Sequence, residues 1–203
     1  MITRRAVLAA AAALLAAGLA GRPAAAAGDP VEFVRNLGNQ AIQTLTGSDL
    51  SSSERAHRFR TLLLANFDVP AIGKTVLGRY WRTATPEERQ EYLKLFEEFL
   101  VANYAQRFAQ YAGEQFVVKS VRDDGDQKTV FTEIKRPSGE LARLDWVLRA
   151  EDDSYKILDV KVEGISMSET HRSEFASVIQ NSGGKISGLI DALRKKVDQL
   201  GAG

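Results

Sequence analysis

Few side chains in this sequence are suited to acid–base or nucleophilic chemistry. The 203-residue chain contains two histidines, His57 and His171, and no cysteine. We expect His57 to lie in solvent beside the apolar face of a helix, and His171 to lie at the rim of a helix, one turn before Phe175. No Gly-x-Ser-x-Gly turn is present to expose a serine nucleophile. The sequence therefore predicts a protein that is not an enzyme.

One short pattern resembles the end of a phosphate-binding loop. Gly73-Lys74-Thr75 matches its last three residues, but Asp68 stands where the opening glycine belongs. Cysteine-based zinc, iron–sulfur and disulfide chemistry is excluded, and two histidines are too few for the histidine-based metal motifs. We therefore expect neither a metal nor a cofactor.

A pair of carboxylates falls on one face of a predicted strand. Asp159 and Glu163 are four residues apart, which places them about 13 Å from each other along the strand. That distance is too long for most acid–base pairs. We expect these side chains to form salt bridges with Lys161 or Arg143 instead.

Composition and charge narrow the possible classes of protein. The chain has 27 basic and 26 acidic residues, and 44% of its residues are hydrophobic. Arg4, Arg5 and Arg22 lie in a predicted leader, so the remaining chain is slightly acidic. Nucleic-acid binding needs a basic face, and we expect none here. The composition predicts one globular domain large enough to bury a core. We expect the protein to be a monomer.

Residues 1–27 have the three parts of a cleaved signal peptide. Arg4-Arg5 form a basic start, Ala6–Ala20 are uncharged and apolar, and Ala24–Gly28 offer small residues for cleavage. These fifteen apolar residues are fewer than the ~20 that span a bilayer. We expect export to the periplasm, by the general route or by the twin-arginine route that Arg4-Arg5 partly match.

The first half of the remaining chain predicts helices. A capping box at Ser51–Glu54 opens one helix, and Val69-Pro70 is expected to break it. A second box, Thr85-Pro86-Glu87-Glu88, is the strongest helix start in the sequence. The predicted helices cover 30–45, 51–67, 72–77 and 86 to about 111.

The second half changes to an alternating pattern and then returns to helices. Turn sequences separate four predicted strands of the kind that pair with antiparallel neighbours. One strand face is apolar, and we place Leu158 on it together with Val160 and Val162. The predicted strands are 115–122, 128–136, 141–150 and 154–163, and the last two helices are 166–180 and 186–197.

These elements predict an α+β single domain over residues 28–203. It would contain a four-stranded antiparallel sheet packed against several helices. The apolar residues could fill a solid core or partly line a cavity for an apolar ligand, and periodicity does not separate the two.

Three segments resemble the MlaC/toluene-tolerance family of periplasmic phospholipid-binding proteins. They are Phe67–Arg89, Tyr155–Met167, and the C-terminal stretch that includes Arg172–Phe175 and Gly183–Leu193. The resemblance implies a twisted sheet and helices enclosing a hydrophobic cavity. It also implies a carrier that shuttles glycerophospholipid between an outer-membrane lipoprotein–porin complex and an inner-membrane ABC transporter complex with a substrate-binding ring.

Other functions stay open at this point. A branch of the same family is associated with hopanoids, which would replace the phospholipid ligand. A periplasmic hydrolase on this scaffold and an adaptor with a solid core are the alternatives from other classes. Extractable lipid would separate a carrier from an adaptor, and turnover of a lipid ester would identify a hydrolase.

Nine apolar residues are the predicted walls of the lipid cavity. Four belong to a segment interrupted by Pro70 and Gly73, where packing is expected to be looser. The other five share the apolar face of adjacent strands. The predicted lipid-binding residues are Val69, Ile72, Val76, Leu77, Leu144, Trp146, Leu148, Val160 and Val162.

The leader generates a direct prediction. Because small residues follow a short apolar stretch, the exported protein should begin within two or three residues of Gly28. The intact mass of protein recovered from the periplasm measures this start. A full-length chain retained in the membrane would contradict the prediction.

Overall fold

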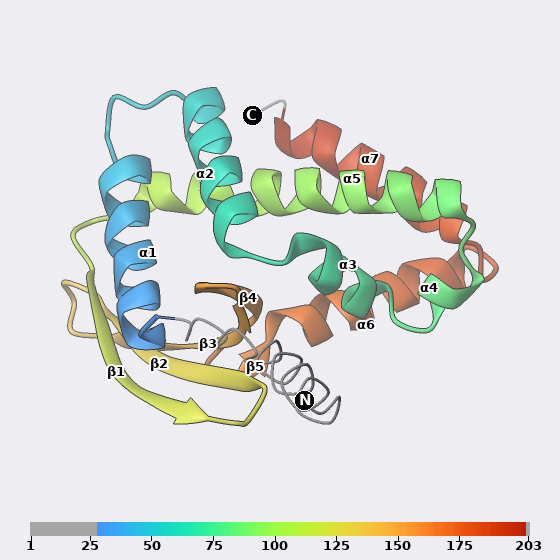
Figure 1. Ribbon diagram of the computed structural model, residues 1–203. Helices are drawn as coiled ribbons and strands as arrows, with labels where there is room; N and C mark the ends of the chain where they lie inside the picture. The colour runs from blue at the N-terminus through green and yellow to red at the C-terminus, as the bar shows by residue number, and fades with distance from the viewer. Residues whose placement is uncertain (1–27, 202–203) are drawn as a thin grey trace, which may run out of the picture.

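The structure is a computed structural model that describes residues 28–201, so the predicted leader and its cleavage lie outside the described residues. The order of elements agrees with the predicted α+β class: helices, an antiparallel sheet, then two helices (Figure 1). The helices are α1 (Pro30–Leu45), α2 (Ser52–Asn66), α3 (Val69–Leu77), α4 (Tyr80–Thr83), α5 (Pro86–Tyr104), the 3-10 helix η1 (Ala105–Gln110), α6 (Met167–Asn181) and α7 (Ile186–Gly201). The strands are β1 (Gln115–Asp123), β2 (Gln127–Lys135), β3 (Leu141–Glu151), β4 (Ser154–Val162) and β5 (Ile165–Ser166).

Side-chain caps fix the starts of α2 and α5. The Thr85 hydroxyl accepts from the Glu88 amide at 3.2 Å, and the Glu88 carboxylate accepts from the Thr85 amide at 2.9 Å, so this capping box is complete. Ser51 caps α2 by accepting from the Glu54 amide. The Glu54 carboxylate binds Arg58 instead of returning to Ser51, so the predicted box at α2 is only half formed.

Helix α3 begins three residues earlier than predicted. Asp68 accepts from the Ala71 amide at 3.0 Å, and Pro70 lies in the first turn, where no amide hydrogen is needed. Val69-Pro70 therefore separates two helices and at the same time starts the second. Gly73-Lys74-Thr75 lies inside this helix.

The long helix α5 ends at Tyr104, earlier than the predicted end near Tyr111. The chain continues as the tighter η1 turn, a common ending for α-helices. Phe108 still packs against Phe59 of α2, with ring centroids 5.9 Å apart. Aromatic packing against α2 therefore continues through a change of helix type.

The strands form one antiparallel meander in the order β1-β2-β3-β4-β5. Four strands match the predicted ones within a residue or so at each end. The fifth, β5, is a two-residue strand that pairs with the end of β4. Its short length leaves no alternating pattern to detect in the sequence.

Buried apolar side chains form two separate cores. The helical core combines α2, α3, α5, α6 and α7 around Tyr92, Phe96 and Phe175. The sheet core lies between α1 and one face of the sheet, and its buried members are Val34, Leu37, Val130, Leu148, Tyr155 and Ile157. Phe67, at the corner between α2 and α3, packs against both.

Helix α1 covers the sheet at close range (Figure 1). A Cβ atom at Gly38 would lie 2.4 Å from the Phe116 ring of β1, so only glycine permits this approach. The Phe116 ring in turn meets the Trp146 ring edge-on at 6.2 Å. Helix α1 therefore fills the apolar face of the sheet.

Candidate functional site

A hollow of about 470 Å³ lies between α3, the start of α6 and the sheet face that α1 does not cover. Val147 and Arg149 of β3 belong to this face, because they alternate with Leu148, which is fully buried in the sheet core. The lining combines apolar side chains with polar and charged ones. It consists of Ala71, Ile72, Thr75, Gln127, Val147, Arg149, Leu158, Asp159, Lys161, Ser166, Ser168 and Glu169.

A bulge in β4 turns Leu158 toward this hollow. Ile157 pairs with Leu148 and Asp159 pairs with Val147, so Leu158 is the extra residue between them. The predicted grouping of Leu158 with Val160 and Val162 is therefore wrong. One additional residue shifts the alternation, and the strand changes faces at that point.

Polar contacts connect the α2–α3 corner to the sheet at the rim of the hollow. Arg149 forms a 2.5 Å salt bridge with Asp68, the residue that caps α3. The Asp68 amide donates to the Ile157 carbonyl at 3.0 Å, and Phe67 forms an isolated parallel bridge with Ile157. The Lys156 ammonium donates to the last carbonyls of α2, at 2.7 and 3.3 Å. We call this boundary between the helical core and the sheet the seam.

The start of α6 is joined to the sheet across the same seam. Asp159 accepts from the Ser168 amide at 3.1 Å, so its carboxylate anchors the first turn of α6. This contact differs from the predicted salt bridge of Asp159 with Lys161 or Arg143.

Glu163 forms the predicted salt bridge with Arg143. Its carboxylate accepts from both the backbone amide and the guanidinium of Arg143. These hydrogen bonds, led by the one from the backbone, hold the pKa of Glu163 below its usual value.

His171 is buried, with 8% of its surface exposed, so the predicted position at a helix rim is wrong. Its Nε2 lies 2.9 Å from the Tyr104 hydroxyl, and its Nδ1 lies 3.1 Å from the Glu174 carboxylate. Phe99 and Phe175 enclose the ring. A neutral imidazole satisfies both neighbours, by donating to Glu174 and accepting from Tyr104.

Tyr104, His171 and Glu174 form a hydrogen-bonded trio that resembles a catalytic arrangement. Burial raises the pKa of the Tyr104 phenol, which disfavours the ionised, nucleophilic form. His57 is exposed on α2, as predicted. In residues 28–201, no three acidic or histidine side chains gather as a metal site would require. The trio instead joins the end of α5 to α6.

The predicted wall residues are distributed over both cores. Val69, Ile72, Val76 and Leu77 are buried members of the helical core. Leu148 is a buried member of the sheet core, and Trp146 and Val160 pack against it. Leu144 and Val162 are half-buried partners on the same sheet face. Of the nine, only Ile72 lines the hollow, and the assignment of these residues to lipid remains a prediction.

All residues that line the hollow except Ile72 were absent from the predicted walls, and Leu158, Arg149 and Val147 show why. Leu158 carried a signal, because apolar residues occupy positions 155 and 157 and then 158, 160 and 162, which requires a change of phase. The sequence contained no signal for Arg149, because its partner Asp68 is far away in the sequence. Val147 gave only a weak signal, because it is an apolar residue that alternates with Asp145 and Arg149 on an otherwise polar face.

Comparison with known proteins places these features in a family. The MlaC protein family matches residues 35–195. Toluene tolerance protein ttg2D of Pseudomonas putida is 26% identical over 126 residues, which span 61% of this chain and 59% of that protein, less than two thirds of its length. The intermembrane phospholipid transport system binding protein MlaC of Haemophilus influenzae is 23% identical over 195 residues, 92% of this chain and 88% of that protein.

A solved structure shares the fold. The phospholipid-binding protein from Ralstonia solanacearum, determined in complex with a phospholipid, aligns with a TM-score of 0.77 and 24% identity. The alignment covers 86% of this chain and 99% of that one. Between residues 28 and 201, no helix is long and apolar enough to cross a membrane.

The buried trio generates a prediction about stability. His171→Ala should lower the free energy of unfolding by about 1–3 kcal/mol, because the Tyr104 hydroxyl loses its acceptor and a cavity opens. His57→Ala, at an exposed position, is the control and should change it by less than about 0.5 kcal/mol. Urea unfolding of both variants measures the difference. Unchanged stability of His171→Ala, with loss of a lipid-ester turnover seen in the parent protein, would identify a catalytic histidine instead.

Proposed function

The chain belongs to the MlaC family, and from this premise we propose that it is a lipid carrier that binds the acyl chains of a glycerophospholipid at the seam. The observation that carries the proposal is the hollow at the seam, whose apolar floor is formed by Ile72, Val147 and Leu158. The relative in Haemophilus influenzae is named as the binding protein of an intermembrane phospholipid transport system, and the Ralstonia solanacearum structure holds a phospholipid. Both support phospholipid as the ligand class.

Acyl chains need a cover outside the bilayer. Two chains of about 16 carbons contain ~30 methylene groups, and exposing each to water costs ~0.8 kcal/mol, or roughly 20 kcal/mol in all. A carrier has to offer a comparably apolar environment. It does not have to bind more tightly than the bilayer, because the lipid must also be released.

The hollow must widen to take such a ligand. Its volume of about 470 Å³ is within the range of pockets for drug-sized molecules, and a two-chain phospholipid is larger. The cores themselves are closely packed, so the additional space has to come from the seam between them. We infer that the sheet moves away from α3 and that the chains enter between the two.

The contacts across the seam are suited to such a movement. The Arg149–Asp68 pair is partly exposed, with 41% and 19% of the two side chains accessible, and pairs of this kind contribute about 0–1 kcal/mol each. The Lys156 ammonium is also at the surface. Separating these groups exposes them to water, where they are solvated, and the incoming chains cover the apolar floor.

We also propose that the protein is exported to the periplasm and that it exchanges lipid with two membrane complexes. Membership of the MlaC family supports both proposals. Residues 1–27 would be removed as a signal peptide, and residues 28–203 would act in the periplasm as one lipid-binding domain. The partners would be an outer-membrane lipoprotein–porin complex and an inner-membrane ABC transporter complex with a substrate-binding ring. The lipid itself performs no chemistry in this cycle, so the carrier needs no catalytic group.

Lipid content of the protein tests the proposal directly. Protein purified from the periplasm should release phospholipid on organic extraction, at up to one molecule per chain, and mass spectrometry identifies the headgroup and chains. Protein free of any extractable lipid, even after incubation with phospholipid vesicles, would contradict the carrier function.

A matched pair of substitutions locates the site. Leu158 lines the hollow and Leu148 lies in the sheet core, on opposite faces of adjacent strands. Leu158→Trp should occupy the hollow and reduce lipid per folded molecule, with a melting temperature close to that of the parent. Leu148→Trp should destabilise the fold by about 1–3 kcal/mol, because the site has no spare volume. Lipid content and thermal unfolding are measured on both.

The reverse outcome has a specific meaning. If Leu148→Trp loses lipid at unchanged stability and Leu158→Trp retains it, the chains bind against the face that α1 covers. The walls predicted from the sequence would then be correct, and the hollow would not be the binding site.

A further inference from the structure

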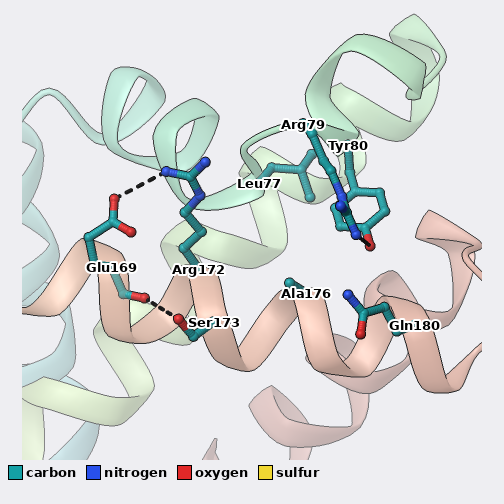
Figure 2. A pocket seen from close by; sticks show the side chains of 8 residues that line it. All are labelled: Leu77, Arg79, Tyr80, Glu169, Arg172, Ser173, Ala176 and Gln180. Carbon is teal, nitrogen blue, oxygen red and sulfur yellow. Dashed lines mark hydrogen bonds and ion pairs between the residues drawn. The ribbon is translucent and has the colours of Figure 1, made fainter.

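A second groove lies at the C-terminal end of α3, between the segment Leu77–Tyr80 and α6 (Figure 2). Its volume is about 280 Å³. Glu169 borders both this groove and the hollow at the seam, so the two are neighbours along α6. The groove is lined by Leu77, Arg79, Tyr80, Glu169, Arg172, Ser173, Ala176 and Gln180.

Cationic hydrogen-bond donors stand on both walls of this groove. Arg79 comes from the α3–α4 corner, and Arg172 comes from α6 (Figure 2). Glu169 is the one carboxylate in the lining, and it bonds a single nitrogen of Arg172 at 3.2 Å. Arg79 forms no salt bridge with any carboxylate of the described residues, and its guanidinium contacts Tyr80 instead. The lining therefore has an excess of positive charge and unused N–H donors.

Tyr80 adds a neutral donor beside Arg79. The Arg79 guanidinium donates to the Tyr80 oxygen at 2.9 Å and lies 4.9 Å from the ring centroid. The phenol accepts in this bond, so its own hydrogen is left to donate. The bond from Arg79 also lowers the pKa of Tyr80, which makes the phenol a stronger donor.

The backbone at Gly78 packs closely against the Arg172 side chain on the opposite wall of the groove. The Gly78 φ of +58° is a left-handed conformation that favours glycine, and a Cβ atom there would lie 2.9 Å from the Arg172 Nε. The backbone at the end of α3 therefore closely approaches this guanidinium. Both arginines are positioned by local structure, although each side chain is at the surface.

We propose that this groove binds the phosphate group of a phosphate-bearing molecule. Donors reach it from two walls, and a tetrahedral phosphate has oxygens that can meet both, whereas a carboxylate presents two oxygens in one plane. The concave shape suits a single protruding group. The inference goes beyond the carrier function, because it involves no acyl chain.

Titration with inorganic phosphate tests the groove. The probe is added to delipidated protein at constant ionic strength, and amide resonances of Gly78, Arg79 and Arg172 are followed by nuclear magnetic resonance. We expect saturable shifts, and a dissociation constant raised about tenfold by either Arg79→Gln or Arg172→Gln, since each removes one charged donor. Thermal unfolding of each variant verifies that it is folded.

Arg82→Gln is the matched control. Arg82 lies in the same short helix as Tyr80, is exposed, and is not part of the groove lining. The substitution removes the same charge and should leave phosphate affinity unchanged. An equal loss in all three variants, or no saturable shift at all, would overturn the proposal.

A second titration distinguishes two possible sources of the phosphate group, the headgroup of the carried lipid and a separate molecule. The same titration is run on protein loaded with phosphatidylglycerol. Weaker binding of inorganic phosphate by the loaded protein assigns the groove to the headgroup of the carried lipid, and equal binding assigns it to a separate phosphate-bearing molecule. Both results retain the site. Lipid extracted from the same samples reports the carrier function independently, so failure of one proposal is distinguishable from failure of the other.

Discussion

Phe67 packs against both apolar cores, and around it the helical part of the protein and the sheet are joined largely by polar contacts. This division constrains what the molecule can bind. Each core is closed by its own helices, so neither offers room for a large apolar ligand without repacking. The seam is different, because the Asp68–Arg149 pair and the Lys156 contacts hold it at its rim. A ligand that separates the two parts disturbs weak surface contacts and the packing of Phe67, and it leaves the rest of each core in place.

The sequence was informative where structure is local. Caps such as Thr85 and Glu88 predicted the start of α5, and alternation predicted four strands with nearly correct bounds. Val69-Pro70 was interpreted as a break alone, because Asp68 can cap a helix only when the chain turns at that residue. The two-residue strand β5 and the four-residue helix α4 are too short for any periodicity.

The candidate site was less predictable, because it depends on contacts that are distant in sequence. Apart from Leu158, the apolar face of the sheet was identified correctly, but the sequence did not indicate that α1 would cover it. The bulge at Leu158 then placed an apolar side chain on the opposite face, at the hollow. His171 shows the same limit, since its burial follows from Tyr104 and Phe99 on α5. Family resemblance supplied the lipid, and the residues alone did not.

Entry of lipid by separation of the sheet from the helical core would change the distance between these two parts of the protein, and that distance can be measured. The chain has no cysteine, so spin labels can be attached at cysteines introduced at Lys94 on α5 and Ser120 on β1, both exposed. Pulsed electron paramagnetic resonance then compares the delipidated protein with protein carrying one phospholipid per chain. Loading with lipid should shift the distance distribution between the labels. An identical distribution in both states, with lipid bound at full occupancy, would contradict this mode of entry.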